Sequence, residues 1–245
     1  MNSTIEQSPL YPLARDIKAI GKSLKYQVHR QFGRVDAQLV ENYLRQHDVR
    51  KLHIGCGYHM LDGWLNSDYQ AIPKDILQVD ATKTFPIDSN KFDYIFTEHM
   101  IEHILYPQGL SMLSECFRVL RKNGTIRVST PDLQFAVGLY QDRKTDPQKE
   151  YIKSSIEHFI AEDTNGNDDV FVINNLFRAW GHQFIYDEKT LRNSLEKAGF
   201  KNIVRCDLGQ SSKQALQNIE NGERLPLGSF QPETLTLEGE KLEDS

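Results

Sequence analysis

Residues 51–57 (KLHIGCG) constrain the fold of this chain more than any other segment. A short apolar run there breaks into Gly-Cys-Gly, and Asp68 and Asp80 follow downstream. Glycine adopts backbone conformations closed to other residues and adds no side chain, so a strand that ends in Gly-x-Gly lets a ligand approach the backbone closely. An ordinary strand followed by a glycine turn explains the pattern equally well. The residues farther along the chain must decide between the two.

Apolar runs and helical patterns alternate from residue 51 to residue 131. The periodicity predicts a helix over residues 109–121 and two further strands after residue 200. The predicted strands span residues 52–54, 64–69, 76–79, 92–97, 125–129, 202–206 and 233–237. This alternation indicates an α/β fold with an open, mostly parallel seven-stranded sheet and flanking helices.

The first connection in this sheet is unusually short. About nine residues separate the first two predicted strands, whereas a parallel crossover usually needs ten to twelve or more. The sequence therefore predicts a shortened first crossover with one helical turn or none. A helix that begins at an N-cap, Asp36, and ends near His47 is expected to cover that face of the sheet instead.

The alternation is interrupted between residues 132 and 186. Asp132 and Asp187 are both expected to cap helices, and a polar loop (AEDTNGNDD) lies between them. We expect a helical insertion after the fifth strand, at about residues 132–186. The predicted organisation is an N-terminal arm with helices (1–48) followed by one domain (49–245).

Composition limits the partners of the chain. The 29 Lys and Arg residues against 34 Asp and Glu give a net charge of −5, which provides no overall attraction to nucleic acid. Residues 13–34 carry six basic residues and form either an amphipathic helix that touches lipid or an anionic partner, or a solvated helix face. No apolar run reaches the length of a membrane span, and the three scattered cysteines fit a reduced, cytoplasmic setting.

Polar side chains and glycines gather at the predicted strand ends, which meet at one crevice in such sheets. They are Gly55, Gly57, Asp68, Asp80, Glu98 and His99. A carboxylate after the second strand can accept hydrogen bonds from ribose hydroxyls, and one after the third can accept one from an adenine amino group. A dinucleotide needs a third glycine where Met60 stands, and its ribose acid lies about 20 residues on. A nucleoside without phosphates fits better.

These residues also carry a resemblance to a known family. The order of KLHIGCG, NSDY, VDATKTFPI, KFDYIFTEHMIEHI, ECFRVLRKNGTIRVSTPDL and EKAGF resembles the class I S-adenosylmethionine-dependent methyltransferases, within a small bacterial group that has a type 11 methyltransferase domain. The resemblance covers about residues 50–206 and implies a Rossmann-like fold.

The resemblance also implies which residues bind S-adenosyl-L-methionine. Gly55, Cys56 and Gly57 would pass under its methionine part, and Asp68 would hold the ribose. Asp80 and Ala81 would flank the adenine, while Glu98 and His99 would close the pocket toward the acceptor. His53 and His59 depart from the family pattern, which often has an acid and a small residue there.

Several cysteine, histidine and aromatic residues allow more than one interpretation. Cys56, between the two glycines, also fits the role of a small packing residue. His99 also fits the role of a general base. His99 and His103 lie four apart, which is half of a metal site if both are helical, but no third ligand is evident, so no metal is expected. Trp180, His182 and Tyr186 form either a local core or the wall of an acceptor pocket.

Together these features predict an S-adenosylmethionine-dependent methyltransferase that acts on a small-molecule or glycan-like acceptor, by O-methylation. His99 or His182 would take the acceptor's proton. The alternative is a non-catalytic S-adenosylmethionine-binding or scaffolding protein with the same fold. The sequence indicates no oligomeric state.

Overall fold

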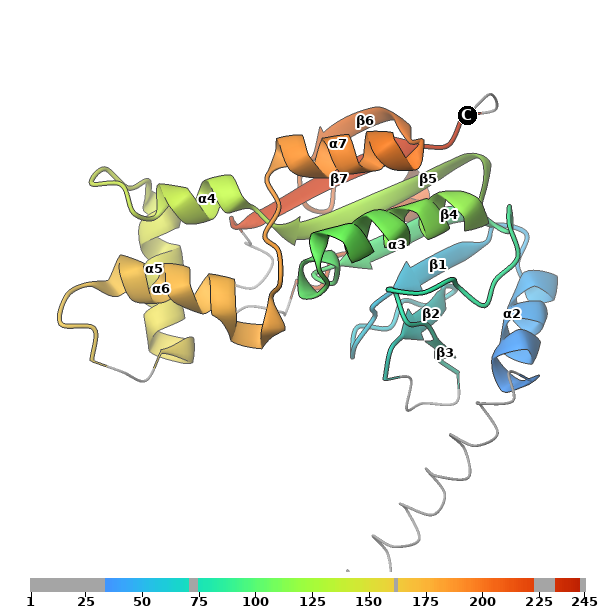
Figure 1. Ribbon diagram of the computed structural model, residues 1–245, viewed down its shortest axis with the longest axis horizontal. Coiled ribbons are helices and arrows are strands. Elements are labelled where there is room, and N and C mark those ends of the chain that lie inside the picture. Colours follow the sequence, from blue (N-terminus) through green and yellow to red (C-terminus); the bar gives the residue numbers. More distant parts are fainter. Residues whose placement is uncertain (1–33, 71–74, 161–162, 223–231, 243–245) are drawn as a thin grey trace, which may run out of the picture.

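The computed structural model describes residues 34–70, 75–160, 163–222 and 232–242. Its centre is a seven-stranded sheet with the order β3-β2-β1-β4-β5-β7-β6 (Figure 1). The strands are β1 Lys51–Ile54, β2 Leu65–Asp68, β3 Leu77–Gln78, β4 Phe92–Glu98, β5 Leu120–Pro131, β6 Lys201–Cys206 and β7 Thr234–Glu240. The first five are parallel, and β7 is antiparallel to β5 and β6. This confirms the predicted Rossmann-like class.

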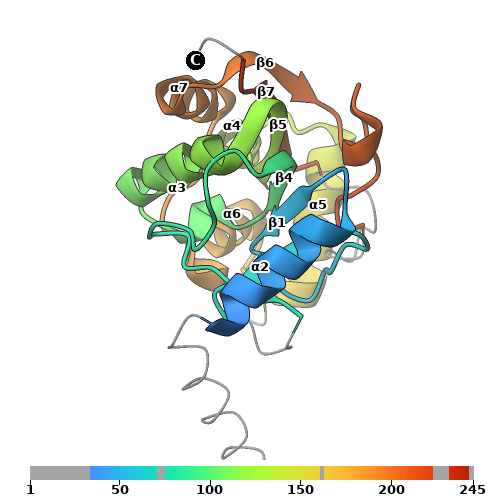
Figure 2. The same cartoon turned by 90° about the vertical axis from the view of Figure 1, so that its right-hand side faces the viewer.

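The connection from β1 to β2 contains no helix, as its length predicts. Helix α2 (Arg34–Gln46) packs against this part of the sheet instead (Figure 2). The hydroxyl oxygen of Tyr43 lies 3.0 Å from the carbonyl oxygens of both Lys51 and Gly63, either of which can accept its hydrogen, and it accepts from the N–H of Lys51 at 2.9 Å. The prediction of Asp36 as an N-cap is wrong, because the helix already includes Arg34. The Asp36 carboxylate instead accepts a hydrogen bond from the backbone N–H of Gln78, 3.3 Å away.

The two faces of the sheet are covered differently. Helices α2, α3 (Tyr106–Val119) and α7 (Glu188–Ala198) bury apolar residues against one face in a single cluster. On the other face, Phe96 packs with Leu216 of the short helix η3 (Gln214–Leu216). The buried guanidinium of Arg127 holds this segment on the sheet, because it lies 2.6 Å from carboxylate oxygens of both Glu220 and Glu238.

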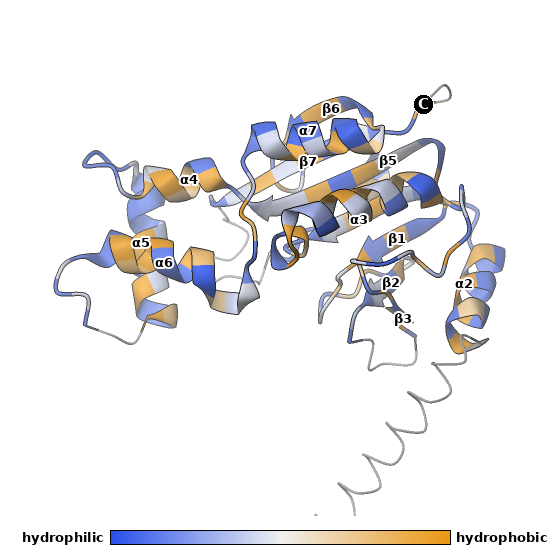
Figure 3. Ribbon diagram, in the orientation of Figure 1, coloured by the Kyte–Doolittle hydropathy of each residue, from blue (hydrophilic) through white to orange (hydrophobic). Residues whose placement is uncertain are grey.

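Helices α4 (Leu133–Gly138), α5 (Asp146–Phe159) and α6 (Asp168–Arg178) form a separate group beyond the carboxyl ends of β4 and β5 (Figure 1). They share a small core of their own, which includes Ala136, Tyr151 and Leu176. Figure 3 shows hydrophobic and hydrophilic residues side by side along these helices, as expected for helices that bury one side. Asp132 caps α4, since its carboxylate accepts from the backbone N–H of Gln134 at 2.9 Å.

Several element boundaries differ from the sequence prediction. Helix α3 begins at Tyr106 and ends at Val119, whereas the periodicity predicts 109–121, and Asn123 and Gly124 lie inside β5. At helix α7, Asp187 is the N-cap, as predicted, and Gly199 is the C-cap. Among the described helices, none has both the length and the apolar character needed to cross a bilayer. The basic stretch 13–34 lies almost entirely outside the described residues, and the division into 1–48 and 49–245 stays a prediction.

Candidate functional site

The loop after β1 turns back onto the end of β2. The backbone N–H groups of Gly55 and Cys56 donate to the carbonyl oxygen of Ser67, at 2.9 and 3.0 Å. The N–H of Gly57 donates to Oδ2 of Asp68, 3.0 Å away. Gly55 and Gly57 have φ angles of +72° and +52°, which glycine adopts without a steric penalty. The sharp turn therefore needs glycine at both positions and leaves the backbone open to a ligand.

Replacing Gly55 with alanine tests this turn. The left-handed φ alone should cost roughly 1–2 kcal/mol of folding stability. The added Cβ would also collide with the side chain of Met100. Gly63→Ala is a matched control, because Gly63 has a φ of +73° and its Cβ would meet only Lys51 Nζ, at 3.7 Å. We expect Gly55→Ala to lower the free energy of unfolding in urea more than Gly63→Ala does.

A second substitution separates the two causes. The Cγ and Cβ atoms of Met100 would both collide with the added Cβ, so the Gly55→Ala/Met100→Gly variant removes both contacts and is compared with Met100→Gly alone. The remaining cost of Gly55→Ala should then fall to that of Gly63→Ala. Equal costs for the two single glycine substitutions would contradict the close approach of Met100 to the turn.

A cavity of about 610 Å³ opens at the glycine turn, and we call it the glycine-loop cavity. Its lining includes Gly55, Gly57, Asp68, Asp80, Ala81 and His99. The order of the strands reverses between β1 and β4, which is where open α/β sheets bind ligands. The volume lies within the usual range for small-molecule pockets. The residues present therefore fit a nucleoside-sized ligand.

The two aspartates in this cavity have different partners. Asp68 accepts from Gly57 and, through Oδ1, from the N–H of Gln70 at 2.9 Å. Asp80 accepts from the N–H and hydroxyl of Thr82, at 3.0 and 2.6 Å, and pairs with the ammonium of Lys83 at 2.9 Å. Burial works against ionisation of Asp80, but the hydrogen bonds from Lys83 and Thr82 outweigh it and lower its pKa. Backbone N–H groups thus hold both side chains in place at the cavity wall.

Two residues predicted for this pocket do not line it. The Cys56 side chain is buried against Ile76, and burial raises the pKa of its thiol to about 11. The Glu98 carboxylate accepts from the backbone N–H of Asn221, at 3.2 and 3.1 Å. Residues two apart on a strand share a face, so Glu98 lies on the side where Phe96 packs against η3. The structure therefore places both side chains away from the glycine-loop cavity.

A second cavity of about 520 Å³ adjoins the first, and we call it the aromatic cavity. Its lining includes Tyr58, Tyr151, Phe159, Leu176, Trp180 and His182. The ring centroid of Trp180 lies 5.4 Å from that of Phe159 and 5.8 Å from that of His182. His99 and His103 line both cavities. The two cavities therefore meet at a pair of imidazoles.

Glu102 lines the aromatic cavity beside this junction and is fully buried in the fold. Its Oε1 lies 3.2 Å from Nδ1 of His99, and its Oε2 accepts from the hydroxyl of Thr130 at 3.0 Å. Burial opposes its ionisation, but the hydrogen bond from His99 and the nearby charges of His99 and His103 outweigh it and lower its pKa. A carboxylate thus orients the His99 ring between the two cavities.

His99 itself has a strained backbone. Its φ is +46°, and Trp180 across the aromatic cavity has a φ of +57°. Side-chain-bearing residues rarely adopt this conformation, which costs on the order of 1–3 kcal/mol and concentrates at functional sites. Nε2 of His99 lies 3.3 Å from the hydroxyl of Thr234, so both ring nitrogens are held. Because His99 precedes the short helix η1 (Ile101–His103), it does not share a helical face with His103, contrary to the sequence-based hypothesis.

A comparison with known families identifies the segment that carries most of these residues. Residues 56–128 match the model of a family described as a methyltransferase domain. The chain contains a methyltransferase domain. The match includes Gly57, Asp68, Asp80 and His99. It confirms both the resemblance to class I S-adenosylmethionine-dependent methyltransferases and the predicted cofactor.

Solved structures of other methyltransferases resemble this one remotely. One from Thermotoga maritima, described as a possible histamine N-methyltransferase, is 16% identical over 89% of this chain and 97% of its own, with a TM-score of 0.43. One from Archaeoglobus fulgidus is 17% identical over 84% of this chain and 93% of its own, with a TM-score of 0.44. No curated protein matches the chain. A likeness this remote identifies no acceptor.

The acceptor side of the methyltransferase differs from the sequence prediction at Tyr186. This residue is fully buried, its ring packs against Phe184 and Tyr106, and it is not part of the wall of the aromatic cavity. Its hydroxyl lies beside Gly109, where any side chain would collide with it. Burial raises the pKa of Tyr186. The prediction that Tyr186 lies at the acceptor wall is therefore wrong, and the residue belongs to the core.

Several residues at the junction carried no signal in the sequence. Tyr151, Phe159 and Glu102 occupy ordinary helical positions, and only the packing of α5 and α6 brings the first two to the cavity. Tyr58 did offer a signal, because it is an exposed aromatic residue directly after the glycine turn.

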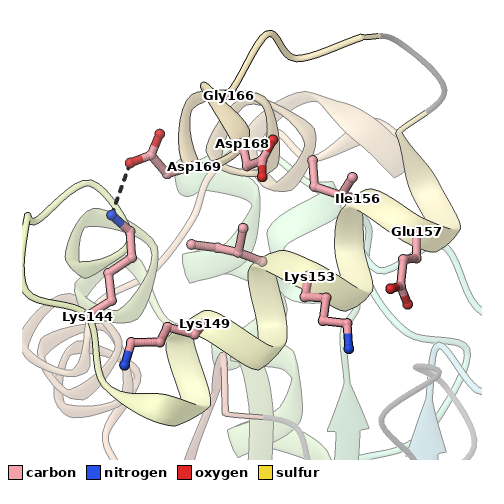
Figure 4. A pocket seen from close by; sticks show the side chains of 9 residues that line it. Lys144, Lys149, Lys153, Ile156, Glu157, Gly166, Asp168 and Asp169 are labelled. Carbon is pink, nitrogen blue, oxygen red and sulfur yellow. Dashed lines mark ion pairs between the residues drawn. The ribbon is translucent and has the colours of Figure 1, made fainter.

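Another cavity of the methyltransferase, of about 420 Å³, lies between α5 and α6 (Figure 4). Lys144, Lys149 and Lys153 stand at its edge together with Asp168 and Asp169, so its charges are mixed. The ammonium of Lys144 lies 3.1 Å from the Asp169 carboxylate. This cavity shares no lining residue with the glycine-loop or aromatic cavity, which separates it from the site of methyl transfer.

Proposed function

We propose that this methyltransferase moves the methyl group of S-adenosylmethionine to a hydroxyl oxygen of a small-molecule or glycan-like acceptor bound in the aromatic cavity. The observation that carries the proposal is the junction of the two cavities at His99 and His103. A cofactor in the first cavity and an acceptor in the second would then both lie against these two imidazoles.

The cofactor side rests on the glycine turn and the two carboxylates. Gly55 and Gly57 would lie under the methionine part, Asp68 would accept from the ribose hydroxyls, and Asp80 with Ala81 would border the adenine. When bound, the cofactor supplies an electrophilic methyl group, and as the acceptor oxygen forms the new O–C bond, the C–S bond breaks and its electron pair stays on sulfur in S-adenosylhomocysteine. Positioning at a near-attack distance and exclusion of water are then the main tasks of the protein.

The acceptor side rests on Trp180 and His182. The Trp180 ring and neighbouring aromatics provide an apolar wall of the kind that packs against a sugar ring or another flat apolar group. Nδ1 of His182 lies 2.5 Å from the carbonyl oxygen of Leu176, which makes Nδ1 the donor and leaves the lone pair on Nε2. His182 or His99 would accept the acceptor's proton during transfer. All three cysteines are free, which fits the cytoplasm as the place of action.

The experiment is a screen of small hydroxyl-bearing molecules and glycans with the purified full chain. The proposal predicts formation of S-adenosylhomocysteine with one class of acceptor, and mass spectrometry should find the product heavier by one methylene unit, with the methyl on oxygen. A methyl group found on nitrogen or carbon would contradict O-methylation. Cofactor binding without turnover on any acceptor would favour the non-catalytic alternative.

A further inference from the structure

We propose that Glu102, His103 and His182 bind a divalent transition-metal ion where the aromatic cavity meets the glycine-loop cavity. One ligand atom from each residue lies within 4.8 Å of the other two. All three residues line the aromatic cavity. Helix η1 supplies two of them, and the third comes from the segment after α6.

The chemistry of the three donors selects the kind of ion. Two imidazoles and one carboxylate suit zinc and neighbouring transition metals, whereas magnesium and calcium prefer oxygen ligands. Catalytic zinc sites have three protein ligands of this type and keep a fourth position open. The cavity beside the three side chains would give this open position access to an acceptor.

The surroundings of the three side chains resemble the outer shell of a metal site. Histidine ligands usually donate their other ring nitrogen to a carbonyl or carboxylate, which fixes the tautomer. His182 does this through Nδ1 to the Leu176 carbonyl, so that Nε2 carries the lone pair a metal needs. Oε2 of Glu102 accepts from Thr130, which holds the carboxylate in place.

The backbone also joins the two segments that carry the ligands. The N–H groups of Gln183 and Phe184 donate to the carbonyl oxygen of Glu102, at 2.7 and 3.1 Å. The rings of His103 and His182 lie with their centroids 4.9 Å apart. Zinc–nitrogen bonds of about 2.0–2.1 Å place tetrahedral ligand atoms roughly 3.3–3.5 Å apart. Rotation of the His103 imidazole, which is not buried, would narrow the remaining gap while His182 keeps its hydrogen bond to Leu176.

A metal here would extend the acceptor chemistry, and this part rests on the proposed function. An acceptor hydroxyl bound to the ion through its oxygen would lose its proton more readily, because a Lewis acid stabilises the alkoxide. His182 would then act as a ligand, and His99 would be the remaining candidate for the base.

The test is a titration of the full chain with Co²⁺, after dialysis against a chelator, followed by visible absorption. We expect one equivalent to bind with the bands of a four- or five-coordinate ion, and zinc to displace it. His103→Ala and His182→Ala should each weaken binding at least about tenfold, because loss of even an outer-shell partner costs 10–100-fold. His158→Ala is the control, since this histidine is exposed and its Nδ1 bonds to the Ser154 carbonyl within its own helix.

Affinity for S-adenosylhomocysteine and circular dichroism report whether each variant is folded. The proposal is overturned if folded wild-type protein binds neither Co²⁺ nor zinc stoichiometrically, or if both histidine variants bind as the wild type does. Methyl transfer undiminished in excess chelator would overturn the role of the ion in activating the acceptor and leave the proposed function intact. Stoichiometric binding lost in both variants would support the site even if no acceptor were ever methylated.

Discussion

Asp68→Ala is expected to weaken the binding of S-adenosylhomocysteine by about ten- to a hundredfold. Asp68 lines the glycine-loop cavity and already accepts from the N–H of Gly57. Its loss would leave two ribose hydroxyls without a charge-assisted partner, and such a hydrogen bond contributes about 1.5–3 kcal/mol. Isothermal titration calorimetry of the variant and the wild-type chain measures the difference directly.

Two control variants isolate the role of the carboxylate. Asp62→Ala removes the same charge from an exposed position in the β1–β2 connection and should leave the affinity nearly unchanged. Cys56→Ala alters the residue between the two glycines, but its side chain packs against Ile76 outside the cavity. Equal affinities for Asp68→Ala and Cys56→Ala would mean that the ribose is held elsewhere.

His182→Ala is expected to reduce methyl transfer by roughly 10²–10⁴-fold, the range typical of a lost general base. Cofactor affinity should change little, because His182 lines the aromatic cavity and not the glycine-loop cavity. The rate of S-adenosylhomocysteine formation with the acceptor found by screening gives the first quantity, and calorimetry gives the second.

Tyr186→Phe is the matched control on the acceptor side. The Tyr186 hydroxyl is buried and has no hydrogen-bond partner among the described residues. Its removal should therefore leave both the transfer rate and the folding stability close to those of the wild type. A fall in transfer as large as that of His182→Ala would contradict the place of Tyr186 in the core.

The cofactor side of the site can be predicted from the sequence, because local patterns determine which residues lie there. Gly55, Gly57, Asp68 and Asp80 each follow a short apolar run, and parallel strands bring their carboxyl ends to one edge. From its place at a strand end, Glu98 is expected in the cofactor pocket, although the alternation of side chains along β4 predicts that it points to the other face of the sheet. It is two residues from Phe96 and therefore shares the face that η3 covers.

The acceptor side depends on packing between distant segments. His103 and His182 meet only because the backbone of Glu102 pairs with the segment after α6. Spacing along the chain suggested His99 and His103 as partners on one helix, but a left-handed residue at His99 and a helix of three residues separate them. Tyr186 looked like part of the same aromatic group as Trp180, yet it faces the core formed by α3.

The central claim is that the turn after β1 binds a methionine nucleoside, and calorimetric titration of the wild-type chain tests it most directly. No helix follows β1 up to the start of β2, so the turn lacks the helix N-terminus that a dinucleotide pyrophosphate needs. We predict saturable binding of S-adenosylmethionine and S-adenosylhomocysteine, and no binding of NAD. Tight binding of NAD with no heat from either methionine nucleoside would contradict the account.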